Sequence, residues 1–475
     1  MNEKHSSLIS RIIKTNSGVI GLGILLSSIA IALGYGCHYL EIELDLSLLY
    51  WSCLISIYIF LVLPVLIYMC ASLGSIKEYP DHAPKTEFLI IIPAYNESKV
   101  ISNSVNSLLK QDYPRELFQV VVSFNGTDNT NEIARDLGAI VTETRHPGVG
   151  KHNAILHAMS MMSTENDQRY FVIVDADNIV DSFFLKKMND AISATGAQCL
   201  QGWHRVLNGE TSFVSKALYI SYSASSRLYN WGRDRLLKNA LICGTGWACH
   251  ASLMKKYMPL IKTQTEDIEL NGLLMCHENI GVRWVPGAFF YDEKPNDIWV
   301  AVQQRRRWMA GHLRTLRYLF WPCIKKAFTK RSITSLELAV YYCAPVIMSL
   351  SFIQGLILLV SILGTEIRIA HAPYALGLQI ITLFYIFGYQ ILGFGLETKE
   401  WRKAPLYSIY SALFSLCVWN MALFLSWFMI RRNDWIFHTP HAMAQEEIVR
   451  GLNTQIQIHE NYQPTNQKDV EKIVS

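Results

Sequence analysis

Long apolar runs at both ends of the chain constrain its fold more than any other feature. Two runs open the chain, over residues 18–39 and 48–73, and three more follow in the C-terminal part, over residues 339–363, 375–396 and 406–430. Each has roughly the 20 apolar residues that a helix needs to cross a hydrocarbon core of about 30 Å. Only 17% of the 475 residues are charged, against about 25% in typical soluble domains. The sequence therefore predicts a membrane protein and excludes a disordered chain.

The charges beside the first two runs predict how they are oriented. Lys4, Arg11 and Lys14 precede the first run, whereas the connector between the runs has three acidic residues and no Lys or Arg. Positively charged flanks stay in the cytoplasm. We therefore expect Met1 to lie inside, the connector outside, and the chain to return to the cytoplasm near Lys77.

The last apolar run is ambiguous, because positive charge stands at both of its ends. Either it crosses the membrane and its tail is outside, or it lies in the interface or re-enters, and its tail stays inside. Its two Tyr and two Trp residues suit an interfacial position and favour the second reading. We predict four parts: two transmembrane helices in residues 1–75, a cytoplasmic domain with interfacial helices in 76–331, transmembrane or interfacial helices in 332–430, and a polar cytoplasmic tail in 431–475.

The central segment alternates short apolar runs with stretches of helical period. The continuous apolar runs at 88–93, 118–122 and 170–174 are typical of strands buried on both faces. Helical periodicity separates these runs, so we expect an α/β fold with a parallel sheet and right-handed crossovers. Ligands of such sheets bind at the carboxyl ends of the strands. Polar motifs follow all three runs at those ends, which is the first indication of a functional site.

Asp175 and Asp177 stand two residues apart, directly after the third of these apolar runs. Two carboxylates in that place can hold a hard divalent cation that bridges to phosphate oxygens. The alternative is a turn in which the Asp side chains bond to the backbone. The buried strand before Asp175 favours the metal site.

Thr265, Glu266 and Asp267 precede a segment of helical period over residues 268–275. One interpretation is a helix N-cap followed by acidic residues that the helix N-terminus stabilises. The other is a general base that takes a proton from an attacking hydroxyl group. The local sequence leaves both open.

The string from Gln303 to Trp308 contains three consecutive Arg residues before the Trp. Arg binds phosphate through a bidentate fork. Near a membrane, Arg305 and Arg306 could instead anchor lipid headgroups. A second basic segment, from Arg145 to Lys151, is rich in Gly but lacks the P-loop spacing. The formal net charge of +4 is too small to indicate a nucleic-acid partner.

Together and in this order, the motifs resemble the membrane-embedded inverting glycosyltransferases of family 2, which include the synthases of hyaluronan, cellulose, chitin and poly-N-acetylglucosamine. The resemblance covers about residues 87–311. Its four strings are Pro93-Ala-Tyr-Asn-Glu97, Asp175-Ala-Asp177, Thr265-Glu-Asp267 and Gln304-Arg-Arg-Arg-Trp308. It implies an α/β GT-A domain (the nucleotide-diphospho-sugar transferase fold), inserted between transmembrane α-helices on the cytoplasmic side of the cell (inner) membrane.

The resemblance also implies a role for each matching residue. Asp267 is expected to be the catalytic base. The acceptor and the diphosphate are expected to contact Gln304, Arg307, Trp308 and Glu266. The nucleotide is expected to contact Ala94, Tyr95, Glu97, Lys151 and Asp175. Asp177, together with Asp175, is expected to bind Mg²⁺ or Mn²⁺.

Two further segments fit the resemblance, and one position departs from it. Gly244-Thr-Gly246-Trp247 falls where the family has a loop that faces the acceptor, and residues 435–441 resemble a C-terminal element that closes over the nucleotide. Many relatives have an Asp after the second strand that contacts uracil. Ser123 and Phe124 stand there instead, so that contact is not carried over, and the expectation of a UDP-sugar donor is less secure.

The predicted function is processive transfer of a sugar from a nucleotide-sugar donor to a growing β-linked polysaccharide that threads across the membrane. Possible lining residues of the path are Tyr341, Tyr342, Gln354, Tyr385, Tyr389 and Gln390. The first alternative is transfer of one sugar to a membrane lipid, and the second is a transporter or channel with a nucleotide-sensing domain. Membrane lipids are expected partners, and some relatives need an accessory membrane subunit.

Overall fold

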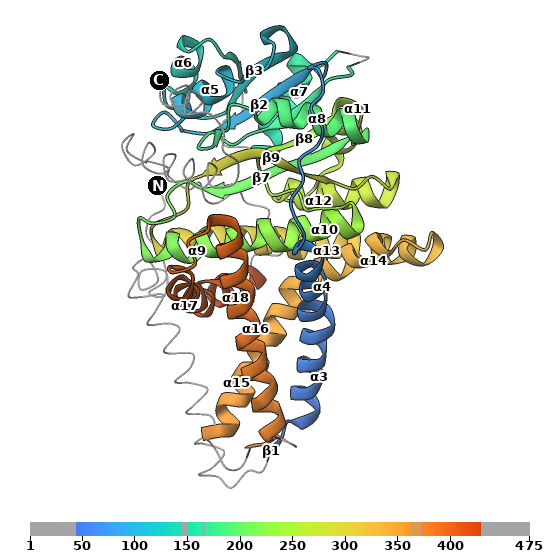
Figure 1. The fold of residues 1–475 in the computed structure, drawn as a ribbon, viewed down its shortest axis with the longest axis vertical. Coiled ribbons are helices and arrows are strands. Elements are labelled where there is room, and N and C mark those ends of the chain that lie inside the picture. Colours follow the sequence, from blue (N-terminus) through green and yellow to red (C-terminus); the bar gives the residue numbers. More distant parts are fainter. Residues whose placement is uncertain (1–43, 145–149, 165–166, 364–366, 370–371, 429–475) are drawn as a thin grey trace.

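The computed structural model describes residues 44–144, 150–164, 167–363, 367–369 and 372–428. An α/β domain lies at one end of the molecule, and a column of long apolar helices lies at the other (Figure 1). A layer of helices that run across the column separates the two. The first apolar run, most of the basic loop before Lys151, and the tail with residues 435–441 fall outside the described residues.

The domain is built on one eight-stranded sheet with the strand order β4-β3-β2-β5-β8-β7-β9-β6. Its strands are β2 (Phe88–Ala94), β3 (Phe118–Phe124), β4 (Ile140–Glu143), β5 (Tyr170–Ile173), β6 (Ile179–Val180), β7 (Cys199–Val206), β8 (Trp247–His250) and β9 (Arg283–Asp292). Strands β4, β3, β2 and β5 are parallel, as predicted. The sheet continues beyond these predicted strands and is mixed, because β8 runs antiparallel to both β5 and β7.

The core lies on both faces of this sheet. Along β2, Leu89 and Ile91 point to one face and Phe88, Ile90 and Ile92 to the other, and all five are buried. This double burial explains the continuous apolar run. One face is covered by α5 (Ile101–Leu109), α6 (Thr130–Asp136) and α8 (Phe184–Thr195), and the other by α7 (Lys151–Met162), α11 (Ala251–Tyr257) and α12 (Glu266–Leu273).

Four helical segments of the described chain are long and apolar enough to cross a membrane: Ser47–Ser72, Ala344–Ser361, Pro373–Thr398 and Ala404–Trp427. They comprise α3 (Ser47–Ile57), η1 (Tyr58–Val62) and α4 (Leu63–Ser72); α15 (Ala344–Leu363); α16 (Ala372–Thr398); and α17 (Ala404–Phe414), η6 (Ser415–Trp419) and α18 (Asn420–Trp427). Large apolar side chains such as Ile59, Ile381 and Phe384 are exposed on them. Exposed apolar side chains on helices of this length fit a surface that faces lipid.

The last of these segments keeps the ambiguity that its sequence has. Its length and composition fit a membrane span. However, α17 packs against α9 (Phe213–Ala224), and α18 packs against α13 (Ile298–Thr329) as well as α15. Figure 1 shows α9 and α13 in the layer between the domain and the column. The segment therefore packs against the layer of crossing helices and also against the column.

A buried carboxylate joins the column to the sheet. Glu397, near the end of α16, accepts hydrogen bonds from Trp203 Nε1 (3.0 Å) and Arg205 Nε (3.2 Å) of β7. All three side chains are buried. A second junction lies where α4 meets α10 (Trp231–Leu237): a Cβ on Gly232 would collide with the backbone of Tyr68. Both junctions hold the domain in a defined position on the helices.

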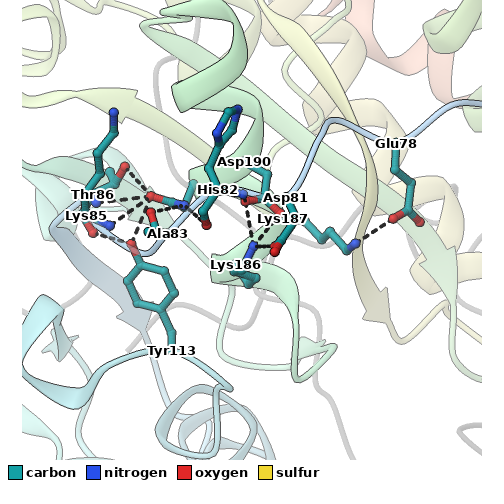
Figure 2. A network of polar contacts seen from close by, with 11 residues as sticks. Glu78, Asp81, His82, Ala83, Lys85, Thr86, Tyr113, Lys186, Lys187 and Asp190 are labelled. Carbon is teal, nitrogen blue, oxygen red and sulfur yellow. Dashed lines mark hydrogen bonds and ion pairs between the residues drawn. The ribbon is translucent and has the colours of Figure 1, made fainter. Parts of the chain in front are cut away.

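The linker from α4 to β2 is clamped onto α8 by a polar network that Figure 2 shows. Asn189 Oδ1 accepts hydrogen bonds from Lys85 N (3.2 Å), Thr86 N (3.2 Å), Thr86 Oγ1 (3.0 Å) and Tyr113 OH (3.3 Å). The Asn189 side-chain amide donates to the carbonyl groups of His82 and Ala83. Asn189 is fully buried, and this one amide satisfies five polar groups of the linker.

We expect the substitution Asn189→Ala to destabilise the protein. Each buried group left without a partner costs about 1–3 kcal/mol, so the free energy of unfolding should fall by at least about 2 kcal/mol. Lys187→Ala is the matched control: it breaks the partly exposed ion pair with Glu78 (2.6 Å) and should cost no more than about 1 kcal/mol. Thermal and denaturant unfolding in detergent measures both, and equal losses would contradict the clamp.

Candidate active site

A cluster of charged residues lies at the carboxyl edge of the sheet. Lys151, the first residue of α7, places its Nζ 2.6 Å from Asp175 Oδ1 and 3.3 Å from Glu266 Oε1. The same ammonium group donates to the carbonyl oxygen of Gly244 at 2.6 Å. Lys151 thus joins the end of β5 and the loop before β8 to the start of α12, and brings together three motifs that are far apart in the sequence.

Asp267 and Arg307 complete this cluster. The pKa of Asp267 is raised to about 7, because enclosure by the protein and the neighbouring Glu266 carboxylate both oppose its ionisation, whereas Lys151 lowers it. Burial lowers the pKa of Arg307, while Glu266, Asp175 and Asp267 act in the opposite direction. Two cations therefore face three carboxylates, one of which titrates near neutral pH.

The carboxylates of this cluster stabilise the positive charge of Lys151. Burial alone would lower that pKa, but the attraction of Asp175, Glu266 and Asp267 outweighs burial and raises it. Lys151 stays protonated at any physiological pH. A fixed positive charge at the end of a parallel strand suits a phosphate-bearing ligand.

The loop before β8 holds Asp175 through a chain of hydrogen bonds. Asp175 N donates to Thr245 Oγ1 (2.9 Å), and that hydroxyl group donates to Asn178 Oδ1 (2.6 Å). Asn178 Nδ2 in turn donates to Asp177 Oδ1 (3.0 Å). Gly244 has a φ of +79°, which favours glycine, and lies beside the Asp267 carboxylate. One short loop thus orients both residues of the Asp-x-Asp pair.

Ala94, Tyr95 and Glu97 lie at the same edge of the sheet. The register of β2 on β5 places Ala94 beside the segment that follows Ile173. Asn125 N donates to the carbonyl oxygen of Ala94 (3.0 Å), and Glu97 N donates to Thr130 Oγ1 (2.9 Å). Tyr95 is half-buried and Glu97 is buried. The structure therefore brings these expected nucleotide contacts to the edge that carries Asp175.

Gln304, Arg307 and Trp308 lie on α13, and all three are half-buried. Helix α13 approaches the start of α12 very closely, because a Cβ on Gly311 would lie 2.6 Å from Thr265 Oγ1. Gly311 is one helical turn after Arg307. This close packing is what brings the Arg of the Gln-x-x-Arg-Trp string beside Glu266 and Asp267.

As the first interpretation predicts, residues 265–267 lie at the start of a helix. Thr265 is the N-cap residue of α12, with Glu266 and Asp267 in its first turn, although the Thr265 side chain makes no capping hydrogen bond. Glu269 Oε2 accepts from the backbone N–H groups of Lys262 (3.0 Å) and Thr263 (2.8 Å) instead. The acidic pair at the helix start is thereby available to Lys151 and Arg307.

Residues 84–311 match the family model described as Glycosyltransferase like family 2. This span contains all four motifs and every residue of the charged cluster. Residues 84–311 are a family 2 glycosyltransferase domain. With the α/β sheet and the apolar helices that flank it, the match confirms the predicted fold class, a GT-A domain inserted between apolar helices.

Three curated proteins place this family 2 domain among its relatives. The probable glycosyltransferase YdaM of Bacillus subtilis is 22% identical over 71% of this chain and 81% of its own length. The poly-beta-1,6-N-acetyl-D-glucosamine synthase of Staphylococcus epidermidis is 25% identical over 52% of this chain and 59% of its own length. The 4,4'-diaponeurosporenoate glycosyltransferase of Staphylococcus aureus is 30% identical over 34% of this chain. The similarity covers 44% of that protein, so it spans less than two thirds of the last two relatives.

Some contacts of this site have no signal in the sequence of the family 2 domain, although the resemblance pointed to the loop at Gly244-Thr-Gly246-Trp247. The Thr245 hydroxyl group and Asn178 hold Asp175 and Asp177, yet they are 67 positions apart. The carbonyl oxygen of Gly244 is 93 positions from Lys151. Gly311 could have been suspected only as a small residue in the helix that follows the Arg-Trp pair. Its contact with Thr265 requires the structure.

We expect Gly311→Ala to lower glycosyltransfer at least tenfold. The added methyl group must push α13 from Thr265, and a displacement of about 1 Å at reacting groups can cost about a hundredfold in rate. Gly355→Ala in α15 is the matched control, because a Cβ there meets nothing within 4 Å. Turnover per folded molecule measures both, and normal turnover of the Gly311 variant would contradict this role.

Proposed function

We propose that this protein transfers a sugar from a nucleotide-diphosphate donor to an acceptor hydroxyl group at the membrane surface, with inversion at the anomeric carbon. One observation carries the proposal: Lys151, Asp175, Glu266, Asp267 and Arg307 form a single charged cluster, although they come from four separate segments of the family 2 domain. Cations for a pyrophosphate and a carboxylate that titrates near pH 7 are what such a transfer needs.

In this proposal Asp267 is the general base. It takes the proton of the acceptor hydroxyl group as the acceptor oxygen bonds to the anomeric carbon and the bond from that carbon to the diphosphate breaks. Lys151 and Arg307 stabilise the negative charge on the departing nucleotide. Trp308 stacks on the terminal acceptor sugar, while Gln304 and Glu266 orient the site. Ala94, Tyr95 and Glu97 contact the nucleotide.

The Asp-x-Asp pair fits a divalent cation that arrives with the diphosphate. Among the described residues, no group of three or more His, Cys, Asp and Glu side chains could hold an ion alone. Mg²⁺ commonly binds one or two carboxylates together with phosphate oxygens and waters, and a half-buried Asp177 at the site's edge meets that need. Asp177, with Asp175, would hold Mg²⁺ or Mn²⁺, which supplies charge neutralisation on the diphosphate.

We further propose a processive enzyme that extends a β-linked polysaccharide and threads it across the membrane. The similarity to a polysaccharide synthase supports this form of the proposal. The similarity to a glycosyltransferase named for a single acceptor, 4,4'-diaponeurosporenoate, supports the alternative of one sugar on a membrane lipid. Several expected path residues bond to backbone carbonyl groups of neighbouring segments: Tyr342 to Ile268, Tyr385 to Val62 and Tyr389 to Ala224.

The four candidate spans support a multi-pass protein of the cell (inner) membrane with the family 2 domain in the cytoplasm. A nucleotide-sugar donor, of which UDP-sugars are the first class to test, would reach the site from that side. An accessory membrane subunit is a possible partner for export of a long product.

Incubation of the purified protein with radiolabelled nucleotide sugars and Mg²⁺ or Mn²⁺ tests the proposal. A ladder of long products supports the processive form, and a single labelled lipid supports the alternative. Flux of solute without transfer to any acceptor would contradict both forms and favour a transporter.

We expect Asp267→Asn to keep donor binding but to reduce turnover by about 10² to 10⁴, the usual contribution of general acid–base catalysis. Glu269→Gln is the matched control on the same helix, because Gln retains an oxygen for the N–H groups of Lys262 and Thr263. Donor affinity by calorimetry and turnover by label transfer separate the two effects. Turnover of the Asp267 variant at the wild-type rate would exclude the base role.

The pKa of about 7 for Asp267 also predicts a pH profile. Because only the ionised carboxylate accepts a proton, kcat/KM should rise about tenfold per pH unit below 7 and level off above it. Glu266→Gln removes a negative neighbour and should move the rise to lower pH, whereas Lys151→Met removes a positive one and should move it higher. A profile that is flat between pH 5.5 and 8.5 would contradict the assignment.

A further inference from the structure

Arg305 lies inside an aromatic enclosure on α13. Its guanidinium carbon is 5.4 Å from the ring centroid of Trp308, 4.8 Å from that of Phe414 and 5.3 Å from that of Trp419. The residue is fully buried. Phe414 and Trp419 belong to α17 and η6, the last apolar segment. The cation is therefore held between the helix of the proposed acceptor site and a helix that is apolar enough to face lipid.

The guanidinium group of Arg305 is only partly satisfied. Nη1 donates to the carbonyl oxygen of Ala301 (3.1 Å) and to Gln304 Oε1 (3.4 Å). Nε and Nη2 are buried and have no hydrogen-bond partner among the residues that the structure describes. A planar guanidinium fork with two unpartnered N–H positions matches the geometry of a phosphate or carboxylate group.

Arg205 and Arg233, two other enclosed arginines, also have a guanidinium nitrogen without a partner among the described residues, but each has a carboxylate counter-ion. Arg205 pairs with Glu397 at 3.2 Å, and Arg233 pairs with Glu337. Burial lowers the pKa of Arg305 to about 10, so the group still carries its charge at neutral pH. Taking an ion out of water without a counter-charge is unfavourable, and aromatic faces offset only part of that cost.

We propose that Arg305 binds the anionic group of a membrane lipid, a phosphate or a carboxylate, within the enclosure of Trp308, Phe414 and Trp419. The apolar segment on one side supplies a surface for the lipid chain. Trp and Tyr side chains at such a level suit the boundary between headgroups and acyl chains. The anion completes the two unpartnered positions of the guanidinium group.

Two sources could supply this anionic group: a phospholipid of the bilayer, or a lipid that itself accepts the sugar. The second source rests on the proposed function, because Trp308 touches both Arg305 and the proposed acceptor position. The first source does not depend on it. An experiment with a binding measurement and a transfer measurement therefore separates the two.

The binding measurement uses the full chain in nanodiscs with spin-labelled phosphatidylglycerol or spin-labelled phosphatidylcholine. The wild-type protein should immobilise the anionic probe at least fivefold more than the zwitterionic one. Arg305→Gln should reduce that preference to below twofold, while Arg305→Lys should keep part of it because the charge remains. Lys330→Gln, at the end of the same helix, is the control and should leave the preference unchanged.

The transfer measurement offers 12-hydroxydodecyl phosphate, 12-hydroxydodecanoate and dodecane-1,12-diol, each of which carries an acceptor hydroxyl group, to the wild-type protein with the labelled donor. Labelled product from the anionic compounds alone, with a KM that Arg305→Gln raises at least fivefold, assigns the site to an acceptor. Anionic binding without labelled product assigns it to bilayer phospholipid. A wild-type protein with no transferase activity at all would contradict the proposed function but leave the binding result intact.

Two outcomes would overturn the proposal. The first is equal binding of both spin-labelled lipids by the wild-type protein. The second is an unchanged preference in Arg305→Gln or, if that variant does not fold, an unchanged preference in Arg305→Lys, whose ammonium group lacks the planar fork.

Discussion

The arrangement of the charged cluster depends on the position of one ammonium group, that of Lys151. Lys151 bonds to Asp175, Glu266 and the carbonyl oxygen of Gly244, and so it draws the end of β5, the loop before β8 and the start of α12 to one point. Without that cation, Arg307 alone would face three carboxylates in an enclosed space, where like charges repel strongly. The cluster therefore explains both the arrangement of the loops and the unusual titration of Asp267.

The layer of helices between the domain and the column contributes directly to this arrangement. Helix α13 carries Arg307 into the cluster, while the same helix presents Tyr318 and Trp321 on its exposed surface. Gly311 allows the contact with Thr265 that fixes the distance between α13 and α12. The family 2 domain is thus completed by a helix that lies at the boundary with the apolar column (Figure 1).

Much of the domain could be predicted from the sequence, because its first strands are buried on both faces. Residues 88–92 form a continuous apolar run for that reason, and the polar motifs that follow such runs had to meet at one edge. The antiparallel β8 has only four residues, Trp247–His250, and no pattern that distinguishes it from a loop. Contacts such as Asn189 with Thr86, 103 positions apart, depend on tertiary packing and leave no local pattern.

The junction at Glu397 couples the orientation of α16 to the sheet. A helix that is longer than the local hydrocarbon thickness tilts to keep its apolar surface covered. Glu397 lies near the end of α16 and accepts hydrogen bonds from β7. A change in the tilt of α16 in a thinner or thicker bilayer would therefore displace β7, an inner strand of the sheet. In a bilayer, the sheet whose edge carries the charged cluster would then follow the tilt of α16.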